Sequence, residues 1–273
     1  MAVVDILVPQ YRLPQPLMWE ATNQMMAFSA CKCTMRAIQT AHLSKGRVDP
    51  REIHHPSECP KGKHDIFMPP RLSSSVIHWT RNVLLEQRRP NCDYVLFMDD
   101  DIVPEPDYLD RLLAHKKDIV GGLCTQRQDP PRPTIRQWME ETQNYGALIE
   151  WPHGGLIEVD AIGTGFLLLS RRVIEDVARA YHPKEYAKDG RGWWFRFKWG
   201  PLGGEFGEDI SFSWKAQRIG FQIYCDTSVT PGHVGDYPYS IKDFFEHQKA
   251  YIEGVVGLTE EAKAVRTLKA TGA

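Results

Sequence analysis

The sequence has no long hydrophobic run. A helix needs about 18 apolar residues to cross a bilayer, and the longest apolar stretches here, such as residues 166–169, have only the length of a buried strand. The N-terminus, Met-Ala-Val-Val-Asp, also lacks the basic and apolar regions of a secretory signal. We therefore expect no integral membrane segment and a cytoplasmic location.

The chain also lacks a strong charge of either sign. Its formal net charge is −2, so it offers no globally basic surface to nucleic acid or to an anionic membrane. Hydrophobic residues make up 42% of the 273 positions, enough for a sizeable core that needs no crosslinks. Length and composition predict a globular protein of one large or two small domains.

Cysteine is sparse: six residues are spread along the chain, which favours reduced thiols over a disulfide framework. A zinc site is the alternative for residues 31–64, which contain both cysteine and histidine. The Cys-x-Cys pair in that segment is tighter than the usual zinc-ligand pair, so we favour buried or incidental cysteines. The residues concerned are Cys31, Cys33, Cys59, His54, His55 and His64.

Strand and helix patterns alternate in the first half of the chain, which indicates a βαβ sheet. A serine run at residues 73–75 is well placed to cap a following helix, and residues 44–63, rich in Pro, Gly, His and charge, predict an inserted loop. Strands are expected at residues 3–8, 65–69, 94–98 and 118–123, and helices at 14–40, 76–87 and 106–115.

The second half mixes both element types around a long Gly- and Trp-rich loop at residues 189–207. The apolar patterns predict strands at residues 156–160, 163–169 and 222–226, helices at 171–181 and 209–219, and a charged helical tail from Ile241.

Three adjacent aspartates, Asp99, Asp100 and Asp101, follow a near-continuous apolar strand. Three neighbouring carboxylates repel one another and are hard to explain as packing, and in an open α/β sheet this end of a strand is where ligands bind. Hard oxygen ligands here suit Mg²⁺ or Mn²⁺ holding a diphosphate. The alternative is an acidic, solvated loop or a helix N-cap.

Glu208 and Asp209 follow a glycine-rich loop at the start of an expected helix. An ionised carboxylate at this place can take a proton from an attacking hydroxyl, which is general-base chemistry. The alternative is that either residue merely caps the helix.

His233 lies in a glycine-rich stretch, Pro-Gly-His-Val-Gly, where irregular exposed backbone argues against an ordinary core histidine. Its imidazole is a candidate ligand for the same metal. A lone histidine is weak evidence by itself.

A cluster of aromatic and basic residues includes Trp193, Trp194, Arg196 and Trp199, with glycines on both sides. Aromatic faces can stack on a sugar or a base, and glycine hinges suit a mobile lid. A hydrophobic loop folded onto the core is the equal alternative.

In this order the motifs resemble the GT-A superfamily of nucleotide-sugar glycosyltransferases, the family-2-like members most of all, over about residues 3–235. The resemblance implies an α/β GT-A fold, with a Rossmann-like mixed central sheet flanked by helices in a single domain. It implies a nucleotide-sugar-binding βαβ half at residues 1–125, with an insertion at 44–63, an acceptor-binding half at 126–240, and a helical C-terminal tail at 241–273.

The resemblance also implies roles for individual residues. It places Mn²⁺ or Mg²⁺ on Asp99, Asp101 and His233, with Asp101 in direct contact, and it makes Asp209 the catalytic base with Glu208 beside it. Asp99 would reach the donor ribose or a metal-bound water, and Asp100 would face the sugar. Trp193, Trp194, Arg196 and Trp199 would form an acceptor site or lid. The nucleotide-sugar would contact Pro9, Gln10, Tyr11, Arg12, Arg81, Asp99, Asp100, Gly163, Thr164 and Gly165.

The implied function is that of a hexosyltransferase-type glycosyltransferase, with a UDP-linked donor as the default and inversion through Asp209. A retaining transferase is an alternative. A sugar nucleotidyltransferase is another, but residues 9–14 lack the glycine-rich basic loop of that class. A non-catalytic carbohydrate- or nucleic-acid-binding protein leaves the acidic residues and His233 without a joint explanation.

The sequence lacks the Gln-x-x-Arg-Trp signature of processive synthases, and residues 44–63 have no clear counterpart in the family. The hydroxyl acceptor stays open among a glycan, a lipid, a small molecule, a protein and a hydroxylated base in DNA.

Overall fold

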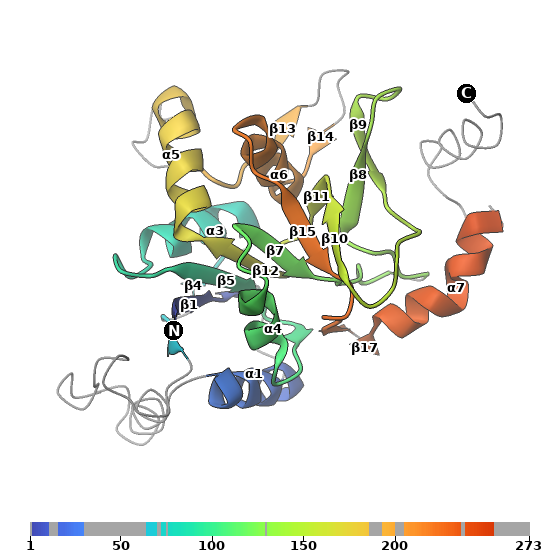
Figure 1. Cartoon of the computed structure of the whole chain (residues 1–273), viewed down its shortest axis with the longest axis horizontal. Helices are drawn as coiled ribbons and strands as arrows, with labels where there is room; N and C mark the ends of the chain where they lie inside the picture. Colours follow the sequence, from blue (N-terminus) through green and yellow to red (C-terminus); the bar gives the residue numbers. More distant parts are fainter. Residues whose placement is uncertain are drawn as a thin grey trace.

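A seven-stranded mixed sheet forms the centre of the molecule, with helices on both faces (Figure 1). The computed structural model describes residues 2–10, 16–29, 64–69, 72–74, 76–128, 130–185, 193–199, 205–235 and 238–253. The strand order in the sheet is β10-β15-β7-β12-β5-β1-β3. Its strands are β1 (Val3–Leu7), β3 (Asp65–Phe67), β5 (Tyr94–Met98), β7 (Ile119–Gly122), β10 (Leu156–Val159), β12 (Phe166–Ser170) and β15 (Ile223–Asp226).

Both faces of the central strands are buried. Along β5, Val95 and Phe97 belong to the core on one face of the sheet, and Leu96 and Met98 to the core on the other. All four side chains are fully buried. Burial of one such side chain contributes about 1.5–3 kcal/mol. The two-sided core therefore accounts for the near-continuous hydrophobic pattern of this strand.

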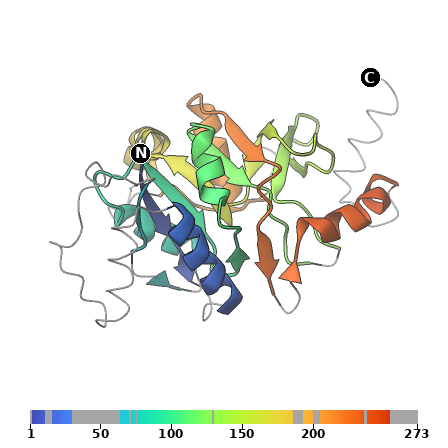
Figure 2. The ribbon, with the colours of Figure 1, turned by 60° about the horizontal axis from the view of Figure 1, so that its bottom comes forward.

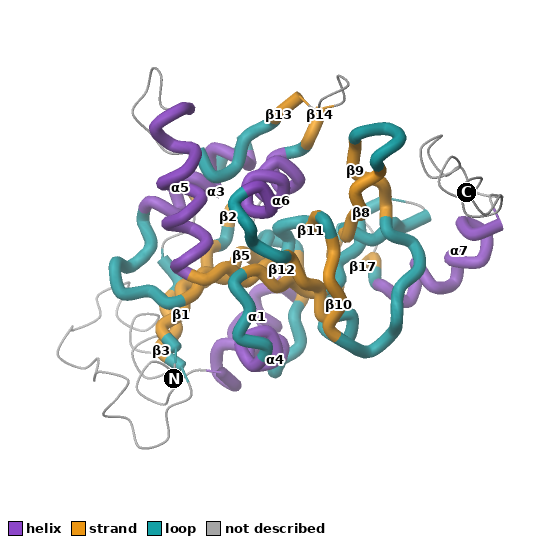
Figure 3. The backbone as a smooth tube through the Cα atoms, turned by 45° about the horizontal axis from the view of Figure 1, so that its top comes forward, coloured by secondary structure: helices purple, strands orange, loops and turns teal. Residues whose placement is uncertain are grey.

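The helices form the outer layers (Figure 3). α1 (Pro16–Ser29) and α4 (Tyr108–Ala114) contribute Met18 and Leu109 to the core on one face, and they lie on the same side of the sheet (Figure 2). The other face is covered by α3 (Ile77–Glu86), α5 (Arg171–Glu185) and α6 (Glu208–Arg218). The predicted α/β class, with a mixed central sheet flanked by helices, is confirmed.

Two antiparallel strands make the sheet mixed: β10, which pairs with β15 at one edge, and β12 inside the sheet. β12 runs antiparallel between β5 and β7, whereas β1 pairs parallel with β3 and β5, and β7 pairs parallel with β15. The βαβ alternation of the first half therefore does not continue as a run of adjacent parallel strands, because a strand from the second half enters the sheet between β5 and β7.

Smaller sheets surround the carboxyl ends of β5 and β7. In one of them, β8 and β9 form a hairpin that the sequence patterns did not reveal, and β11 pairs with β8. These sheets comprise β8 (Ile135–Met139), β9 (Asn144–Ala147) and β11 (Ala161–Ile162); β6 (Ile102–Val103), β16 (Gly232–Val234) and β17 (Pro238–Tyr239); β13 (Lys198–Trp199) and β14 (Glu205–Phe206); and β2 (Pro9–Gln10) and β4 (Leu72–Ser73).

α7 (Ile241–Glu253) is the expected helix of the C-terminal tail and leads away from the sheet (Figure 1). Phe244 of α7 packs against the rest of the fold, because its ring stacks on Trp151 with centroids 5.2 Å apart. The side-chain amide of Gln248 donates to the carbonyl of Ile149 at 2.8 Å.

Where they fall on described residues, the expected helices and strands agree with the structure in kind; residues 30–40 of the helix expected at 14–40 lie outside the described residues. The predicted serine cap of α3 is wrong. The N-cap position is Val76, which makes no side-chain cap, and the Ser74 hydroxyl instead accepts the Val76 N–H at 3.1 Å.

Cys92, Cys124 and Cys225 are buried free thiols. Within the described ranges, no helix has the length and apolar character needed to span a membrane.

The cysteines and most of the histidines in the alternative zinc segment lie outside the described residues, together with the insertion at residues 44–63. Only His64 is described, and its ring accepts the Ala2 N–H at 3.2 Å.

A hydrogen-bonded carboxylate joins the end of α4 to the end of β15. Asp226 Oδ2 lies 2.8 Å from His115 Nε2, and the Ser228 backbone N–H donates to Asp226 Oδ1 at 2.9 Å. Burial raises the pKa of Asp226, but the hydrogen bonds from His115 and Ser228 outweigh burial and hold the pKa below its ordinary value. The ionised form therefore stabilises the fold above the ordinary pKa, and this stabilisation is lost as the pH falls through the lowered value.

We predict that Asp226→Asn lowers the free energy of unfolding by about 1–3 kcal/mol at pH 7, since it removes a buried, hydrogen-bonded charge. The difference from the parent should narrow as the pH falls through the lowered pKa of Asp226, because the parent carboxylate then becomes protonated. Urea denaturation at several pH values measures both effects. Glu175→Gln, at an exposed carboxylate of α5, is the control and should change little. If Asp226→Asn were less stable than the parent by the same amount at every pH, the ionised carboxylate would not be the source of the stabilisation.

Candidate active site

The Asp99–Asp101 run and His233 meet because β6 pairs with β16. β6 follows Asp101 directly, and in the antiparallel register His233 lies opposite Ile102. The backbone N–H of Val234 also donates to the carbonyl of Asp101 at 2.8 Å. β16 follows β15 after a short connection, so two strands of the sheet send their carboxyl-terminal segments to the same edge.

Asp101 lies between a histidine and an arginine. His233 Nε2 is 3.1 Å from Asp101 Oδ1, and the Arg127 guanidinium is 2.8 Å from Asp101 Oδ2. Burial raises the pKa of Asp101, but the hydrogen bond and charge of His233 and the charge of Arg127 bring it below its ordinary value. Burial lowers the pKa of His233, and the contacts with Asp101 and with the Thr125 carbonyl more than reverse this, so the pKa is raised.

The His233 ring is oriented as in a metal-binding histidine. Nδ1 lies 2.6 Å from the carbonyl of Thr125, to which it donates its proton, and Nε2 points to Asp101. A histidine that gives one ring N–H to a carbonyl presents its other nitrogen for ligation. Among the described residues no group of three or more His, Cys, Asp or Glu side chains is arranged to hold a metal. The contact between Asp101 and His233 brings together one carboxylate and one imidazole, and the predicted metal site on these residues stays a prediction.

Asp99 turns away from this pair and contacts Arg81. Arg81 donates to both oxygens of Asp99, at 2.8 and 3.1 Å, and its other terminal nitrogen donates to Glu208. Arg81 is only 3% exposed. Burial lowers the pKa of Arg81, but the Asp99 and Glu208 carboxylates outweigh this and raise it, so its charge is permanent. The predicted contacts of Asp99 with a metal and of Arg81 with a diphosphate stay predictions.

Asn82, next to Arg81, holds the tryptophan-rich segment. Its side-chain amide donates to the Phe195 carbonyl at 2.7 Å and accepts the Phe195 N–H at 3.0 Å. The Phe195 ring is fully buried, stacked on Phe212 at 5.0 Å. Asn82 therefore holds the backbone of residue 195 through two hydrogen bonds.

Trp194 does not act as a lid in this structure. It is 5% exposed, and its indole N–H donates to the carbonyl of Ile174 at 2.8 Å. The expectation for this residue was wrong because a ring with a buried hydrogen bond is part of the core. Trp193 and Arg196 are at least partly accessible, and the backbone of Trp199 belongs to β13. For these three the predicted contact with an acceptor remains open.

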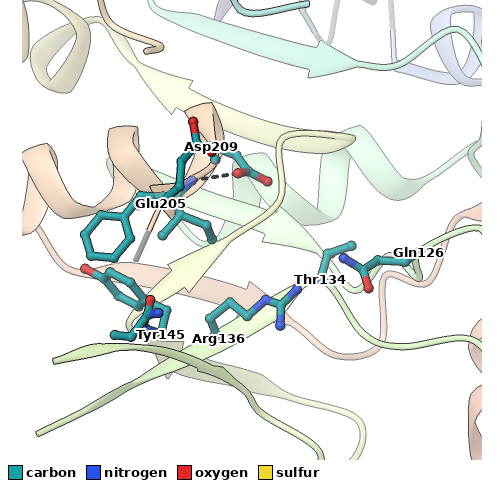
Figure 4. A pocket seen from close by; sticks show the side chains of 10 residues that line it. Gln126, Thr134, Arg136, Tyr145, Glu205 and Asp209 are labelled. Atoms are coloured by element: carbon teal, nitrogen blue, oxygen red, sulfur yellow. Dashed lines mark hydrogen bonds between the residues drawn. The ribbon is translucent and has the colours of Figure 1, made fainter. Parts of the chain in front are cut away.

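A pocket of about 340 Å³ lies where α6 begins, opposite the β8–β9 hairpin (Figure 4). Asp209 lies on the α6 side, and Arg136 and Tyr145 come from the hairpin on the opposite side (Figure 4). The pocket is lined by Gln126, Thr134, Arg136, Asn144, Tyr145, Glu205, Phe206, Gly207, Asp209 and Ile210.

One short segment links this pocket to the Asp101–His233 pair. Gln126 lines the pocket, and its neighbours in the chain are Thr125, whose carbonyl holds His233, and Arg127, which contacts Asp101. Three consecutive residues therefore contribute to the pocket and hold the side chains of the Asp101–His233 pair.

The carboxylate of Asp209 has the properties of a proton acceptor. Burial and the neighbouring charge of Glu208 raise the pKa of Asp209 to about 6, opposed by the charges of Arg81 and Arg136 and by the hydrogen bond from Ile210 N–H at 2.7 Å. A general base works best with a pKa close to the working pH. Glu208, in contrast, is engaged by Arg81.

The remaining expected contacts of a donor are distributed around this edge of the sheet. Pro9 and Gln10 form β2, beyond the end of β1, whereas Tyr11 and Arg12 lie outside the described residues. Asp100 is 7% exposed and Thr164 3%. The Gly165 carbonyl accepts the Asp99 N–H at 3.0 Å, so residues 163–165 lie beside the aspartates.

Sequence reasoning missed Arg127, Arg136 and Tyr145. All three come from residues 126–155, to which no element was assigned, and the strand of Arg136 pairs with residues about ten and twenty-five positions away. The alternating pattern around Arg136 and Trp138 was the only available signal, and it does not show which charges face Asp101 or Asp209.

Comparison with known proteins gives a distant relative. No family model matches the chain. Procollagen galactosyltransferase 2 of Homo sapiens is 23% identical to it over 201 residues, which cover 71% of this chain and 29% of that protein. The chain thus spans less than a third of the length of that relative. The similarity to a galactosyltransferase confirms the resemblance to glycosyltransferases predicted from the motifs.

Solved structures show general similarity only. GalNAc-T7, crystallised with UDP, GalNAc and Mn²⁺, is 10% identical with a TM-score of 0.46, covering 86% of this chain and 44% of that one. A nucleoside-diphosphate-sugar pyrophosphorylase from Vibrio cholerae is also 10% identical, with a TM-score of 0.39, covering 81% and 90%. Neither likeness assigns a residue role or separates transferase from nucleotidyltransferase.

We predict that Arg81→Met lowers the free energy of unfolding by about 3 kcal/mol, because it leaves the partly buried carboxylates of Asp99 and Glu208 without their counter-charge. Chemical denaturation at pH 7 measures the loss. Arg196→Met, at an exposed side chain, is the matched control and should stay within about 0.5 kcal/mol of the parent. Equal stabilities of the two variants would show that the buried ion pairs contribute little.

Proposed function

We propose that this chain is a metal-dependent glycosyltransferase that moves a sugar from a nucleotide diphosphate sugar, with UDP as the default nucleotide, to an acceptor hydroxyl. The observation that carries the proposal is the position of Asp209: a carboxylate with a raised pKa in a pocket that residues 125–127 connect to the Asp101–His233 pair. Such a layout provides a base for the acceptor and a cation site for the leaving diphosphate at one edge of the sheet.

Asp101 and His233 are the residues that would hold Mn²⁺ or Mg²⁺, together with phosphate oxygens of the donor and, by the family resemblance, Asp99. When bound, the cation supplies positive charge that stabilises the diphosphate as a leaving group. Arg127 already contacts Asp101 and adds a second positive charge at the same place. Arg81 holds Asp99 and Glu208 in position through its two ion pairs.

Asp209 would act on the acceptor. Its carboxylate takes the proton of the acceptor hydroxyl while the hydroxyl oxygen forms a bond to the anomeric carbon and the bond to the diphosphate breaks. Attack from the side opposite the diphosphate inverts the anomeric centre. The first-formed anomer, identified by proton NMR, separates this inverting course from a retaining one.

The two alternative functions, a sugar nucleotidyltransferase and a non-catalytic carbohydrate binder, do not account for Asp209 and the Asp101–His233 pair together. A sugar nucleotidyltransferase needs no base for a sugar hydroxyl acceptor, and a non-catalytic carbohydrate binder needs neither the raised pKa of Asp209 nor the pairing of Asp101 with His233. Hydrolysis of a nucleotide-sugar in the presence of Mn²⁺ separates an enzyme from a binder. A thermal-shift screen of nucleotide-sugars with Mn²⁺ identifies the donor, because a bound donor stabilises the folded state.

We predict that Asp101→Asn reduces Mn²⁺-dependent turnover of the donor by about 100-fold or more, since an amide is a weaker ligand without charge. Mn²⁺ binding in the presence of UDP, measured by calorimetry, should weaken in parallel. Asp107→Asn, at a half-exposed carboxylate beside α4, is the control and should retain both properties. Unchanged metal dependence in Asp101→Asn would remove Asp101 from the metal site.

We predict that the parent enzyme gains activity as the pH rises through about 6, where Asp209 ionises among Glu208, Arg81 and Arg136. Asp209→Asn should lose about 10²–10⁴-fold in turnover. Because the folded pKa of Asp209 is raised, its ionisation costs stability as the pH rises through that value. Asp209→Asn should therefore melt at a temperature equal to or above that of the parent at pH 8. If Asp209→Asn kept the turnover of the parent, or showed the same dependence of activity on pH as the parent, Asp209 would be excluded as the base.

A further inference from the structure

A second cavity shares Tyr145 with the Asp209 pocket. Its volume is about 300 Å³. It is lined by Trp138 and Tyr145 from the β8–β9 hairpin, Asp160 from the end of β10, and Trp214, Gln217 and Arg218 from α6. Tyr145 lines both cavities, so the second cavity adjoins the proposed site of reaction at this residue.

The polar groups of the second cavity are held in place. Asp160 Oδ2 accepts the Trp138 N–H at 2.6 Å, and the Tyr145 hydroxyl donates to Gln217 Oε1 at 3.1 Å. The Gln217 amide N–H lies 3.4 Å from Asp160 Oδ1. A carboxylate, an amide and a hydroxyl are thus linked in a row along the wall, which fixes their orientation before any ligand binds.

The aromatic groups are also fixed. Trp138 packs against Tyr145 edge to face, with centroids 5.0 Å apart, and is itself only partly buried. Trp214 is held by two cations, with Lys198 Nζ 4.1 Å and Arg218 Cζ 5.2 Å from its ring centroid. Two partly accessible indole rings therefore line a cavity that also offers planar polar side chains.

This combination fits a sugar ring better than a lipid chain or a nucleic acid. A pyranose has an apolar face that packs on an indole and hydroxyl edges that bind carboxylate, amide and guanidinium groups. A lipid chain would place apolar surface against the charged side chains of Asp160 and Arg218, and a nucleic acid backbone would be repelled by Asp160.

We propose that the second cavity is a subsite for the neighbouring sugar of an oligosaccharide acceptor, whose reacting sugar lies in the adjoining Asp209 pocket. The inference rests on the proposed glycosyltransferase function and narrows its acceptor to a glycan of at least two sugars. Trp138 supplies the stacking surface, and Asp160, Gln217 and Arg218 bind hydroxyls.

The test compares sugar binding by the parent, Trp138→Ala and Phe67→Ala. Phe67 is a matched control because it is an exposed aromatic residue on β3, at the opposite edge of the seven-stranded sheet from β10. A glycan array of neutral mono- and oligosaccharides provides the probes, and saturation-transfer NMR measures the affinity of the strongest one. Thermal melting shows whether each variant is folded, and Gln217→Ala serves as the second variant if Trp138→Ala is not.

We expect that an oligosaccharide binds the parent at least about 10-fold more tightly than its component monosaccharide. Trp138→Ala, or Gln217→Ala in its place, should lose that difference, and Phe67→Ala should keep it. Absence of oligosaccharide binding on the array, or a preference that survives the substitutions, would overturn it. Hydrolysis of a nucleotide-sugar with Mn²⁺ is measured on the same samples. It should be present in the parent and persist in Phe67→Ala. Absence of hydrolysis in the parent would count against the proposed enzymatic function, whereas loss of the oligosaccharide preference concerns the subsite alone.

Discussion

The buried guanidinium of Arg81 is the constraint on which the candidate site depends. Asp99 lies at the end of β5 and Glu208 at the start of α6, and both contact this one cation. Without it, several carboxylates would face one another at one edge of the sheet and repel. By joining a strand end to a helix start, Arg81 sets where the next residue of α6, Asp209, projects. An electrostatic requirement thus determines the position of the proposed base.

A second set of contacts determines where the proposed cation site lies relative to that base. The pairing of β6 with β16 brings His233 to Asp101. In the connecting segment, Thr125 contacts His233, Arg127 contacts Asp101, and Gln126 between them lines the pocket of Asp209. The site is therefore assembled from backbone pairing and one connecting segment, not from a single contiguous motif. Such assembly from strand ends is typical of open α/β sheets.

Much of the fold was predictable because buried strands and helices need apolar residues at regular positions, which the sequence shows directly. β5 was expected at its observed bounds, since a strand covered on both faces needs an unbroken apolar run. The β8–β9 hairpin was not expected, because it lies at the surface and its residues alternate only weakly. Trp194 was misjudged for a related reason: a tryptophan that packs inward and one that covers a pocket look alike in sequence.

The sequence by itself determined the chemical inventory: three carboxylates after a strand, an acidic pair at a helix start, and a histidine in a glycine-rich stretch. Local repulsion and local backbone preference are enough to mark these residues as unusual. Only the tertiary structure decided which of them meet, because pairing between distant strands has no local signature. It separated Asp99, bound to Arg81, from Asp101, bound to His233, and it placed Tyr145 in the lining of two cavities.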